Sequence, residues 1–214
     1  MFYIFSTILF IFFIKLIIIC SIIINGDFML KNYFYKKNSN KNYANRGMGL
    51  EYDINLSNEY YKINDIAYIY KKPTPIKLVD VDYKIGKIKE AYFMTPSTTD
   101  YNGIYKGKYI DFEAKETTSK TSFSLSNLHE HQIKHLIDVK NHGAISFLIV
   151  RITSLDETYL LDVNNLEYFL KNYERKSIPL DFFKSYGTII KMKYNPRIDY
   201  LSVIDKVYFG GNKL

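Results

Sequence analysis

The sequence predicts an α/β fold in which one mixed β-sheet is flanked by helices and a β-hairpin protrudes from the domain. Three observations predict this fold. Helical and strand-like patterns alternate along the chain. The run "AISFLIVRI" is apolar throughout, which is typical of a strand covered on both faces. Two further β-rich runs, joined by a short turn, carry several lysines and indicate the hairpin.

The first elements precede and include this hairpin. A helix is expected from Met48 to about Ile63, because apolar side chains recur there at helical spacing. "IAYIYKK" is expected to be a strand that Pro73 ends. The runs "IKLVDVDY" and "KIKEAYF" form the predicted hairpin, with its turn around Gly86.

A second pair of strands and a helix come next. One strand is expected to end at Tyr105 and the next to span residues 109–117, with a turn at Gly107 between them. The following helix has Ser126 as its expected N-cap and Gly143 beyond its end. The run "AISFLIVRI", the strand "TYLLDV", the short helix "NNLEYFLKNY" and a mixed tail complete the chain.

The helix after Ser126 carries polar residues on an apolar face. Leu128, Leu136 and Val139 form the predicted apolar stripe. Gln132 and His135 fall on the same face. A polar side chain on such a stripe needs a partner, and a hydrogen bond in the core satisfies this need more often than a ligand does.

The chain divides into three segments. With 214 residues it is long enough for one domain with a substantial core, and short for two. Residues 47–214 form this domain, with the hairpin at about 76–95. Residues 29–46 are polar, basic and without hydrophobic period, which predicts a flexible arm. Residues 1–28 contain an apolar segment.

The apolar segment has two interpretations. Residues 2–24 are apolar over about the length that spans a bilayer, which indicates a membrane anchor with the rest of the chain in the cytoplasm. Alternatively, Met29 is the true start and the preceding residues are translated upstream sequence from an A/T-rich genome. The second interpretation predicts a cytoplasmic protein.

Charge and cysteine content restrict the function. The net charge of +7 favours polyanionic partners, of which nucleic acid is the commonest. Cys20 is the single cysteine, which excludes a disulfide framework and a cysteine zinc site within one chain.

One stretch, "STTDYNGIYKGKYIDFEAKET", carries candidate chemistry. Successive side chains of a strand point to opposite faces, so Glu113 and Lys115 share one face. Asp100 would lie beside Glu113 if the intervening turn pairs their strands. Two such carboxylates can hold Mg²⁺, and a neighbouring lysine can orient water and offset charge on a phosphate. This is the arrangement of metal-dependent nucleases, although a surface hairpin with a Glu/Lys pair is the commoner meaning of such a pattern.

A family resemblance favours the nuclease. The blocks "YANRGMGLE", "KKPTPI", "EAYFMTPSTTDYNGIYKGKYIDFEAKET", "HEHQIKHL" and "YFGG" cover nearly everything from Tyr43 to Gly211. They resemble the successive blocks of the RecU family of Holliday-junction resolvases. The resemblance implies a restriction-endonuclease-like core of the PD-(D/E)xK superfamily, with the hairpin as a protruding stalk.

The resemblance also implies residue roles. Asp100, Glu113 and Lys115 match the catalytic motif, and Thr98 and Gln132 match positions that complete the metal site with the two carboxylates. The implied cofactor is Mg²⁺, with Mn²⁺ as a substitute. Candidate DNA contacts are Arg46 of the arm and the hairpin lysines Lys77, Lys84, Lys87 and Lys89.

The implied activity is structure-selective cleavage of DNA. The family works as a homodimer that resolves four-way junctions by paired symmetric nicks during homologous recombination and DNA repair. Expected partners are junction DNA, a second copy of the chain, and recombinase and branch-migration proteins. The alternative is a junction-binding accessory protein without cleavage, which would need none of the three motif residues.

Other polar residues are weaker candidates. Glu51, in the first helix, is expected to be solvated rather than to face the site. Asp111 lies on the Glu113 face of its strand. At most two of His129, His131 and His135 can share a helix face, which disfavours a histidine metal site.

Overall fold

The computed structural model describes residues 49–94 and 98–210. Its helices are α2 (Gly49–Ile63), α3 (Glu130–Asn141), α4 (Val163–Asn172), α5 (Leu180–Tyr186) and α6 (Tyr200–Tyr208). Its strands are β1 (Tyr68–Lys71), β2 (Ile76–Asp82), β3 (Lys87–Phe93), β4 (Tyr101–Tyr105), β5 (Lys108–Thr117), β6 (Ser122–Ser124), β7 (Ile145–Ile152), β8 (Glu157–Asp162), β9 (Ser177–Pro179) and β10 (Thr188–Ile189). The arm, the apolar segment and Arg46 lie outside the described residues.

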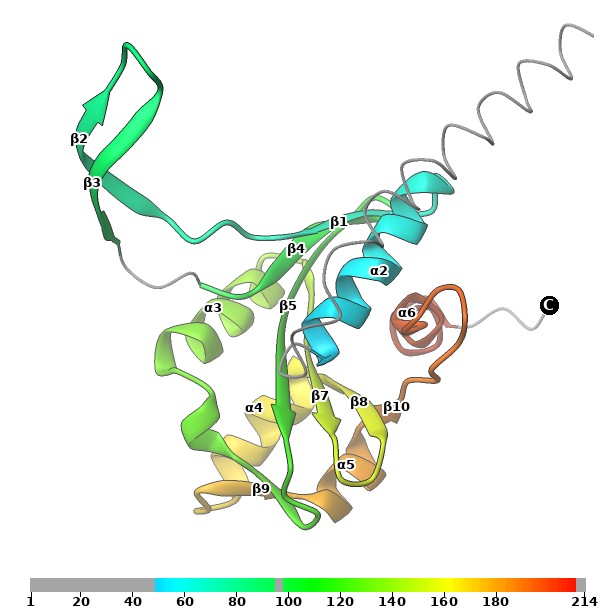
Figure 1. Cartoon of the computed structure of the whole chain (residues 1–214). Helices are drawn as coiled ribbons and strands as arrows, with labels where there is room; N and C mark the ends of the chain where they lie inside the picture. Colours follow the sequence, from blue (N-terminus) through cyan, green and yellow to red (C-terminus); the bar gives the residue numbers. More distant parts are fainter. Residues whose placement is uncertain (1–48, 95–97, 211–214) are drawn as a thin grey trace, which may run out of the picture. The chain divides into compact units, whose positions relative to one another are not determined.

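The described part of the chain is built on one mixed sheet with the strand order β1-β4-β5-β7-β8-β10. β5 pairs antiparallel with β4 and parallel with β7, and the other neighbours are antiparallel. Helices α2 and α6 cover one face and α3 and α4 the other (Figure 1). This arrangement confirms the predicted α/β class.

The central strands are long and deeply buried. All eight residues of β7 are buried, as its continuous apolar run predicts. On β5, Phe112 points to the α2 side, where its ring stacks on those of Tyr101 and Phe147 at centroid distances of 4.9 and 4.8 Å. On the opposite face, Leu148 and Val150 of β7 pack with the side of the core that contains α3 and α4. The middle of β5 is therefore closely packed on both faces of the sheet.

Specific contacts hold the helices on the sheet. At the start of α2, the backbone N–H of Leu50 donates to Glu116 Oε1 of β5 at 2.9 Å. A carboxylate at this end of a helix is stabilised by its unpaired N–H groups. On the other face, Ser146 Oγ of β7 donates to the carbonyl of Leu136 in α3 at 2.8 Å. Helices α2 and α3 are thus anchored to β5 and β7, the two strands that pair in parallel.

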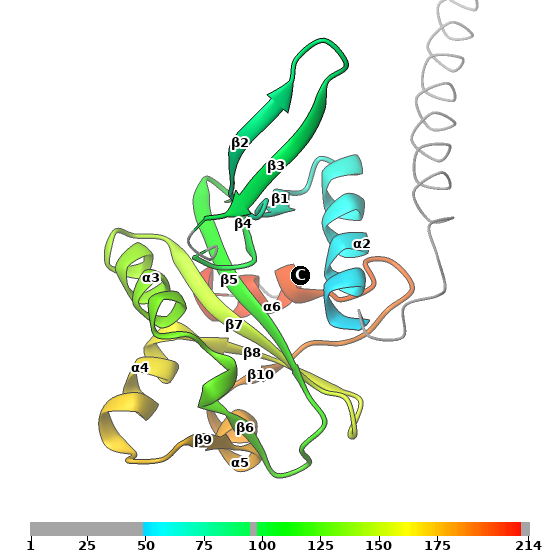
Figure 2. The ribbon, with the colours of Figure 1, turned by 60° about the vertical axis from the view of Figure 1, so that its left-hand side comes forward.

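The hairpin forms a sheet of its own. β2 and β3 pair only with each other among the described strands, and most of their residues are exposed. Figure 2 shows the hairpin extending away from the six-stranded sheet. Its bounds and the turn at Gly86 (φ 63°) agree with the prediction. Within the described ranges, no helix combines enough length and apolarity to cross a bilayer.

The start of α3 differs from the prediction. Ser126 is not its N-cap, because residues Leu125–Asn127 form a separate 3₁₀ turn whose own cap is Ser124. α3 begins at Glu130 with His129 as the N-cap residue, so Leu128 is buried ahead of the helix rather than on its stripe. Gly143 lies beyond the end of the helix in the left-handed region (φ 90°), as expected.

A salt bridge between α3 and α4 is expected to make the stability of the fold depend on pH. Glu167 of α4 contacts Lys140 of α3 at 2.8 Å and Lys171 at 2.6 Å. The hydrogen bond from Lys140, followed by that from Lys171, lowers the pKa of Glu167 to about 2. Because the pKa is lower in the folded state, the pair stabilises the fold above the unfolded pKa and this stabilisation is lost as the pH falls.

We therefore expect Glu167→Gln to lower the free energy of unfolding at neutral pH by less than about 1 kcal/mol, because solvent screens this partly exposed pair. In urea titrations, the difference from the parent should shrink as the pH falls from about 5 toward 2. Glu174→Gln, which changes an exposed glutamate, is the control. A difference that grows on acidification would contradict the prediction.

Candidate active site

Two carboxylates meet where β4 and β5 pair. Tyr101, the first residue of β4, lies opposite Phe112 of β5, so Asp100 and Glu113 are brought to the same end of this pair. The backbone N–H of Asp100 donates to Glu113 Oε2 at 3.0 Å. The N–H of Ala114 lies 3.5 Å from Asp100 Oδ2. The structure thus joins the two carboxylates that the sequence motif predicts.

The environment of Glu113 disfavours its negative charge. The residue is fully buried, whereas Asp100 is half-buried. Burial, and then the neighbouring charge of Asp100, raise the pKa of Glu113 well above its usual range. Lys115 acts in the opposite direction but does not cancel these effects. Two adjacent carboxylates in such a site are stabilised in their ionised form by a cation.

Lys115 lies on the same face as Glu113, as strand alternation predicts. Its Nζ is 2.5 Å from Glu113 Oε1, and about a quarter of its side chain is exposed. Glu113 Oε1 is buried and, within the described ranges, has no hydrogen-bond partner besides this ion pair with Lys115. A buried carboxylate oxygen of this kind, beside a second carboxylate, fits the oxygen ligands that Mg²⁺ prefers. Lys115 is exposed enough to reach a phosphate at the surface.

Thr98 and Gln132 make other contacts. Thr98 is exposed, and its Oγ1 accepts a hydrogen bond from Lys72 Nζ at 3.2 Å. Gln132 is buried, and its Oε1 accepts from the backbone N–H of His129 at 3.0 Å. Gln132 therefore has the partner that its position on the apolar stripe requires, in the first turn of α3. The metal-binding role of these two residues stays a prediction.

A second polar cluster surrounds Asp111, two residues before Glu113. This buried carboxylate contacts Lys72, Thr99, Tyr109 and His135. Strand alternation predicts Asp111 on the Glu113 face, but it does not identify Lys72 as its partner. Lys72 belongs to the block "KKPTPI", which stands out in the sequence for its family resemblance and not for its charge.

The remaining candidates lie elsewhere. Glu51 is partly exposed and pairs with Lys71, so it is not drawn into the carboxylate pair. The rings of His129 and His131 stack at 5.4 Å. In residues 49–94 and 98–210, no three His, Cys, Asp or Glu side chains are grouped so as to hold a metal. The hairpin lysines Lys77, Lys84, Lys87 and Lys89 are exposed, and Lys89 lies 3.6 Å from Asp82.

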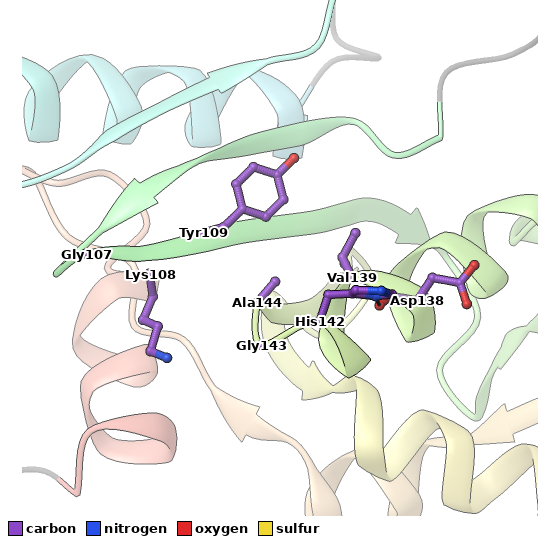
Figure 3. Close-up of a pocket in the computed structure, with 8 residues that line it drawn as sticks. All are labelled: Gly107, Lys108, Tyr109, Asp138, Val139, His142, Gly143 and Ala144. Atoms are coloured by element: carbon purple, nitrogen blue, oxygen red, sulfur yellow. Dashed lines mark hydrogen bonds between the residues drawn. The ribbon is translucent and has the colours of Figure 1, made fainter.

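A hollow of about 420 Å³ is separate from the carboxylate pair. It lies between the start of β5 and the end of α3 and is lined by residues 107–109, 138–139 and 142–144 (Figure 3). Lys108 extends from β5 and Asp138 from α3, while His142 lies just beyond the end of that helix. It contains none of the predicted site residues.

Comparisons with known proteins agree with these features. The family model of RecU, described as Recombination protein U, matches residues 45–206. A protein named Holliday junction resolvase RecU from Geobacillus sp. (strain WCH70) is 58% identical over 175 residues, which cover 79% of this chain and 87% of that protein. One of the same name from Bacillus thuringiensis (strain Al Hakam) is 51% identical over 174 residues, covering 78% and 87%.

A comparison with solved structures finds the Holliday junction resolvase Hjc of Archaeoglobus fulgidus. Its TM-score is 0.41 and its sequence identity 12%, and the match covers 67% of this chain and 95% of that one.

Proposed function

The chain belongs to the RecU family, and we propose that it is a Mg²⁺-dependent endonuclease that resolves four-way DNA junctions by paired symmetric nicks. The observation that carries this proposal is the burial of Glu113 beside Asp100, with Lys115 on the same face. The names of the relatives, which are 51–58% identical, support it.

The motif residues have separate roles in the proposed reaction. Asp100 and Glu113 would hold the cation, with Thr98 and Gln132 completing the site. The cation, when bound, supplies Lewis-acid polarisation of the scissile phosphate and a water of lowered pKa. Lys115 would stabilise the negative charge that develops on the phosphate as water adds and the bond to the leaving oxygen breaks. Mn²⁺ offers the same preference for oxygen ligands and would substitute.

The site is suited to this work by its surroundings. Phe112, stacked between Tyr101 and Phe147, fixes the strand that carries Glu113 and Lys115. Fixed groups need not reorganise when charge develops, so they stabilise a transition state more than mobile groups do. Burial of Glu113 also excludes water from one side of the pair.

The hairpin and the charge of the chain support a junction as the substrate. The net charge of +7 favours binding of the phosphate backbone of any DNA and does not by itself select a four-way junction. Selectivity for four-way DNA would come from the exposed hairpin, acting as a stalk, and from a homodimer. Two symmetric cuts need two sites related by one two-fold axis. Recombinase and branch-migration proteins are the proposed partners during recombination and repair.

An accessory protein that binds junctions without cleavage is the second candidate. Binding would not need a buried carboxylate pair, whose mutual repulsion and desolvation disfavour the fold without a cation.

We also propose that the protein acts in the cytoplasm. Fractionation of cells that express the full chain would separate this location from membrane anchoring through residues 1–24.

One assay tests the proposed function. The purified full chain is mixed with an end-labelled four-way junction or with linear duplex of equal length, with Mg²⁺, Mn²⁺ or EDTA. We expect paired nicks at symmetric positions of the junction with either metal, and no nicks with EDTA. Binding should favour the junction and weaken steeply with added salt. Tight junction binding without cleavage under any metal condition would instead identify the accessory protein.

A further inference from the structure

Asp111 is a buried carboxylate on the catalytic strand that the proposed reaction does not use. It is 0% exposed, and burial of a carboxylate without partners is costly. Its Oδ2 lies 2.8 Å from Lys72 Nζ, 3.1 Å from His135 Nε2 and 3.0 Å from the hydroxyl of Tyr109. Its Oδ1 accepts a hydrogen bond from Thr99 Oγ1. Both oxygens are therefore occupied by the protein itself.

Two of these partners flank the hairpin in the sequence. Lys72 is the last residue before Pro73, where the chain leaves β1 toward β2. Thr99 lies between the end of β3 and the start of β4, where the chain returns. Lys72 Nζ also contacts Thr99 Oγ1, and the N–H of Lys72 donates to the carbonyl of Asp100 at 2.7 Å. A single carboxylate on β5 thus contacts one residue on each side of the hairpin in the sequence, Lys72 before it and Thr99 after it.

Within residues 49–94 and 98–210, strand pairing does not fix the direction of the hairpin relative to the six-stranded sheet. Its strands are mostly exposed and form their own sheet, outside the six-stranded sheet (Figure 2). The bond from Met94 N to the carbonyl of Pro75 closes the base of the hairpin without joining it to the six-stranded sheet. The cluster around Asp111 joins Lys72 and Thr99, which flank the hairpin, to side chains of β5 and α3.

Position on the strand connects this cluster with the active site. Asp111 and Glu113 are two residues apart on one face of β5. Asp111 lies opposite Asn102 of β4, in a segment paired on both sides. A displacement of Lys72 and Thr99 relative to β5 is therefore also a displacement relative to the carboxylate pair.

We propose that Asp111 is a positioning residue that orients the hairpin by fixing its flanking residues, Lys72 and Thr99, to the strand carrying Glu113 and Lys115. The importance of this orientation for cleavage rests on the proposed function, in which the hairpin directs a junction to the site. Asp111 itself does not touch the reacting atoms, because its two oxygens are taken by Lys72, Thr99, Tyr109 and His135.

The direct test measures the orientation of the hairpin without DNA. Spin labels are attached in the full chain at Ile85→Cys, near the exposed tip, and at Lys184→Cys on α5, with Cys20→Ser to remove the native thiol. We expect one narrow distance distribution in this protein and a clearly broader one after Asp111→Asn. A folded Asp111→Asn protein with an unchanged distribution would overturn the proposal.

A matched control distinguishes a specific effect of Asp111 on the hairpin from the general effect of removing any buried carboxylate charge. Asp53 of α2 is also buried, and it pairs with Arg151 at 2.8 Å and with Arg197 at 3.3 Å. Asp53→Asn should lower stability without broadening the distribution, and broadening of equal size would count against a specific role of Asp111. If Asp111→Asn does not fold, Lys72→Met is used, since Lys72 is less buried and should broaden the distribution similarly.

Cleavage provides a second, independent measurement. We expect Asp111→Asn to lower the ratio of junction to duplex cleavage (kcat/KM) by up to about 100-fold, as small misplacements of reacting groups can. Lys72→Met should give the same reduction, and the double variant no further reduction, because both break one ion pair. A parental ratio in folded Asp111→Asn would overturn the proposal. If the parent cuts no DNA, the proposed function fails, while the distance measurement still decides whether Asp111 orients the hairpin.

Discussion

Lys115→Ala and Asp100→Asn are each expected to reduce Mg²⁺-dependent cleavage of a four-way junction by at least about 100-fold, with nearly unchanged junction binding. Loss of Lys115 removes the cation that would face the developing negative charge, and loss of the Asp100 charge removes half of the carboxylate pair. Affinity should persist because it comes from many phosphate contacts over a wide surface.

The measurement is a single-turnover cleavage rate with saturating protein, combined with a binding titration in EDTA. Controls with the same change of charge are Lys134→Ala on the exposed side of α3 and Asp156→Asn in the turn between β7 and β8. Asp156 has a positive φ of 55°, which asparagine also tolerates. Parental cleavage by either motif variant, or equal loss of binding and cleavage in both, would contradict the assignment of the site.

Removal of the hairpin tip should separate junction resolution from the nuclease core. We expect deletion of residues 81–89, closed by Gly-Ser, to leave the melting temperature within a few degrees of the parent. Most of the deleted residues are exposed, and Asp80 and Glu90, which the new turn would join, lie opposite each other on β2 and β3. Junction cleavage should fall far more than Mg²⁺-dependent nicking of duplex, because the duplex does not need a stalk.

A charge variant tests whether the hairpin contributes to DNA binding through its lysines as well as through its shape. Lys84→Ala, Lys87→Ala and Lys89→Ala combined should weaken binding of both DNAs and lower the slope of its salt dependence by about one unit for each phosphate that no longer has a lysine partner. The matched control combines Lys120→Ala, Lys176→Ala and Lys184→Ala, which removes equal charge from exposed positions outside the hairpin.

For the variant that lacks residues 81–89, two outcomes would show that the stalk is misplaced. One is unfolding of the protein, and the other is junction cleavage at the parental rate.

The fold was predictable where one local pattern dominates. The unbroken apolar run of β7 requires cover on both faces, and the turns at Gly86 and Gly107 mark hairpins whose strands have the expected bounds. The contact between Asp100 and Glu113 follows from the same local pairing, since the two residues are only 13 positions apart. Long-range information is not needed for any of these features.

The cluster around Asp111 was less predictable because it depends on tertiary contacts. Lys72 and Asp111 are 39 residues apart, and the hairpin intervenes between them in the sequence. Likewise, Ser126 does not cap α3, because the chain first forms a separate 3₁₀ turn capped by Ser124, and His129 is then the N-cap residue of α3. Local propensity ranks such alternatives weakly, whereas the packed structure selects one of them.

The position of β5 between β4 and β7 has a consequence for the newly made chain. Synthesis proceeds from the N-terminus, so Asp100, Glu113 and Lys115 have all been made before β7 exists. Yet Glu113 lies beside Leu148 of β7 in the parallel pair, and its burial depends on that later strand. A nascent chain that ends before β7 thus contains every motif residue but leaves Glu113 in water. We expect such chains to be inert toward DNA, which would delay the appearance of a nicking activity in the cell until the domain is complete.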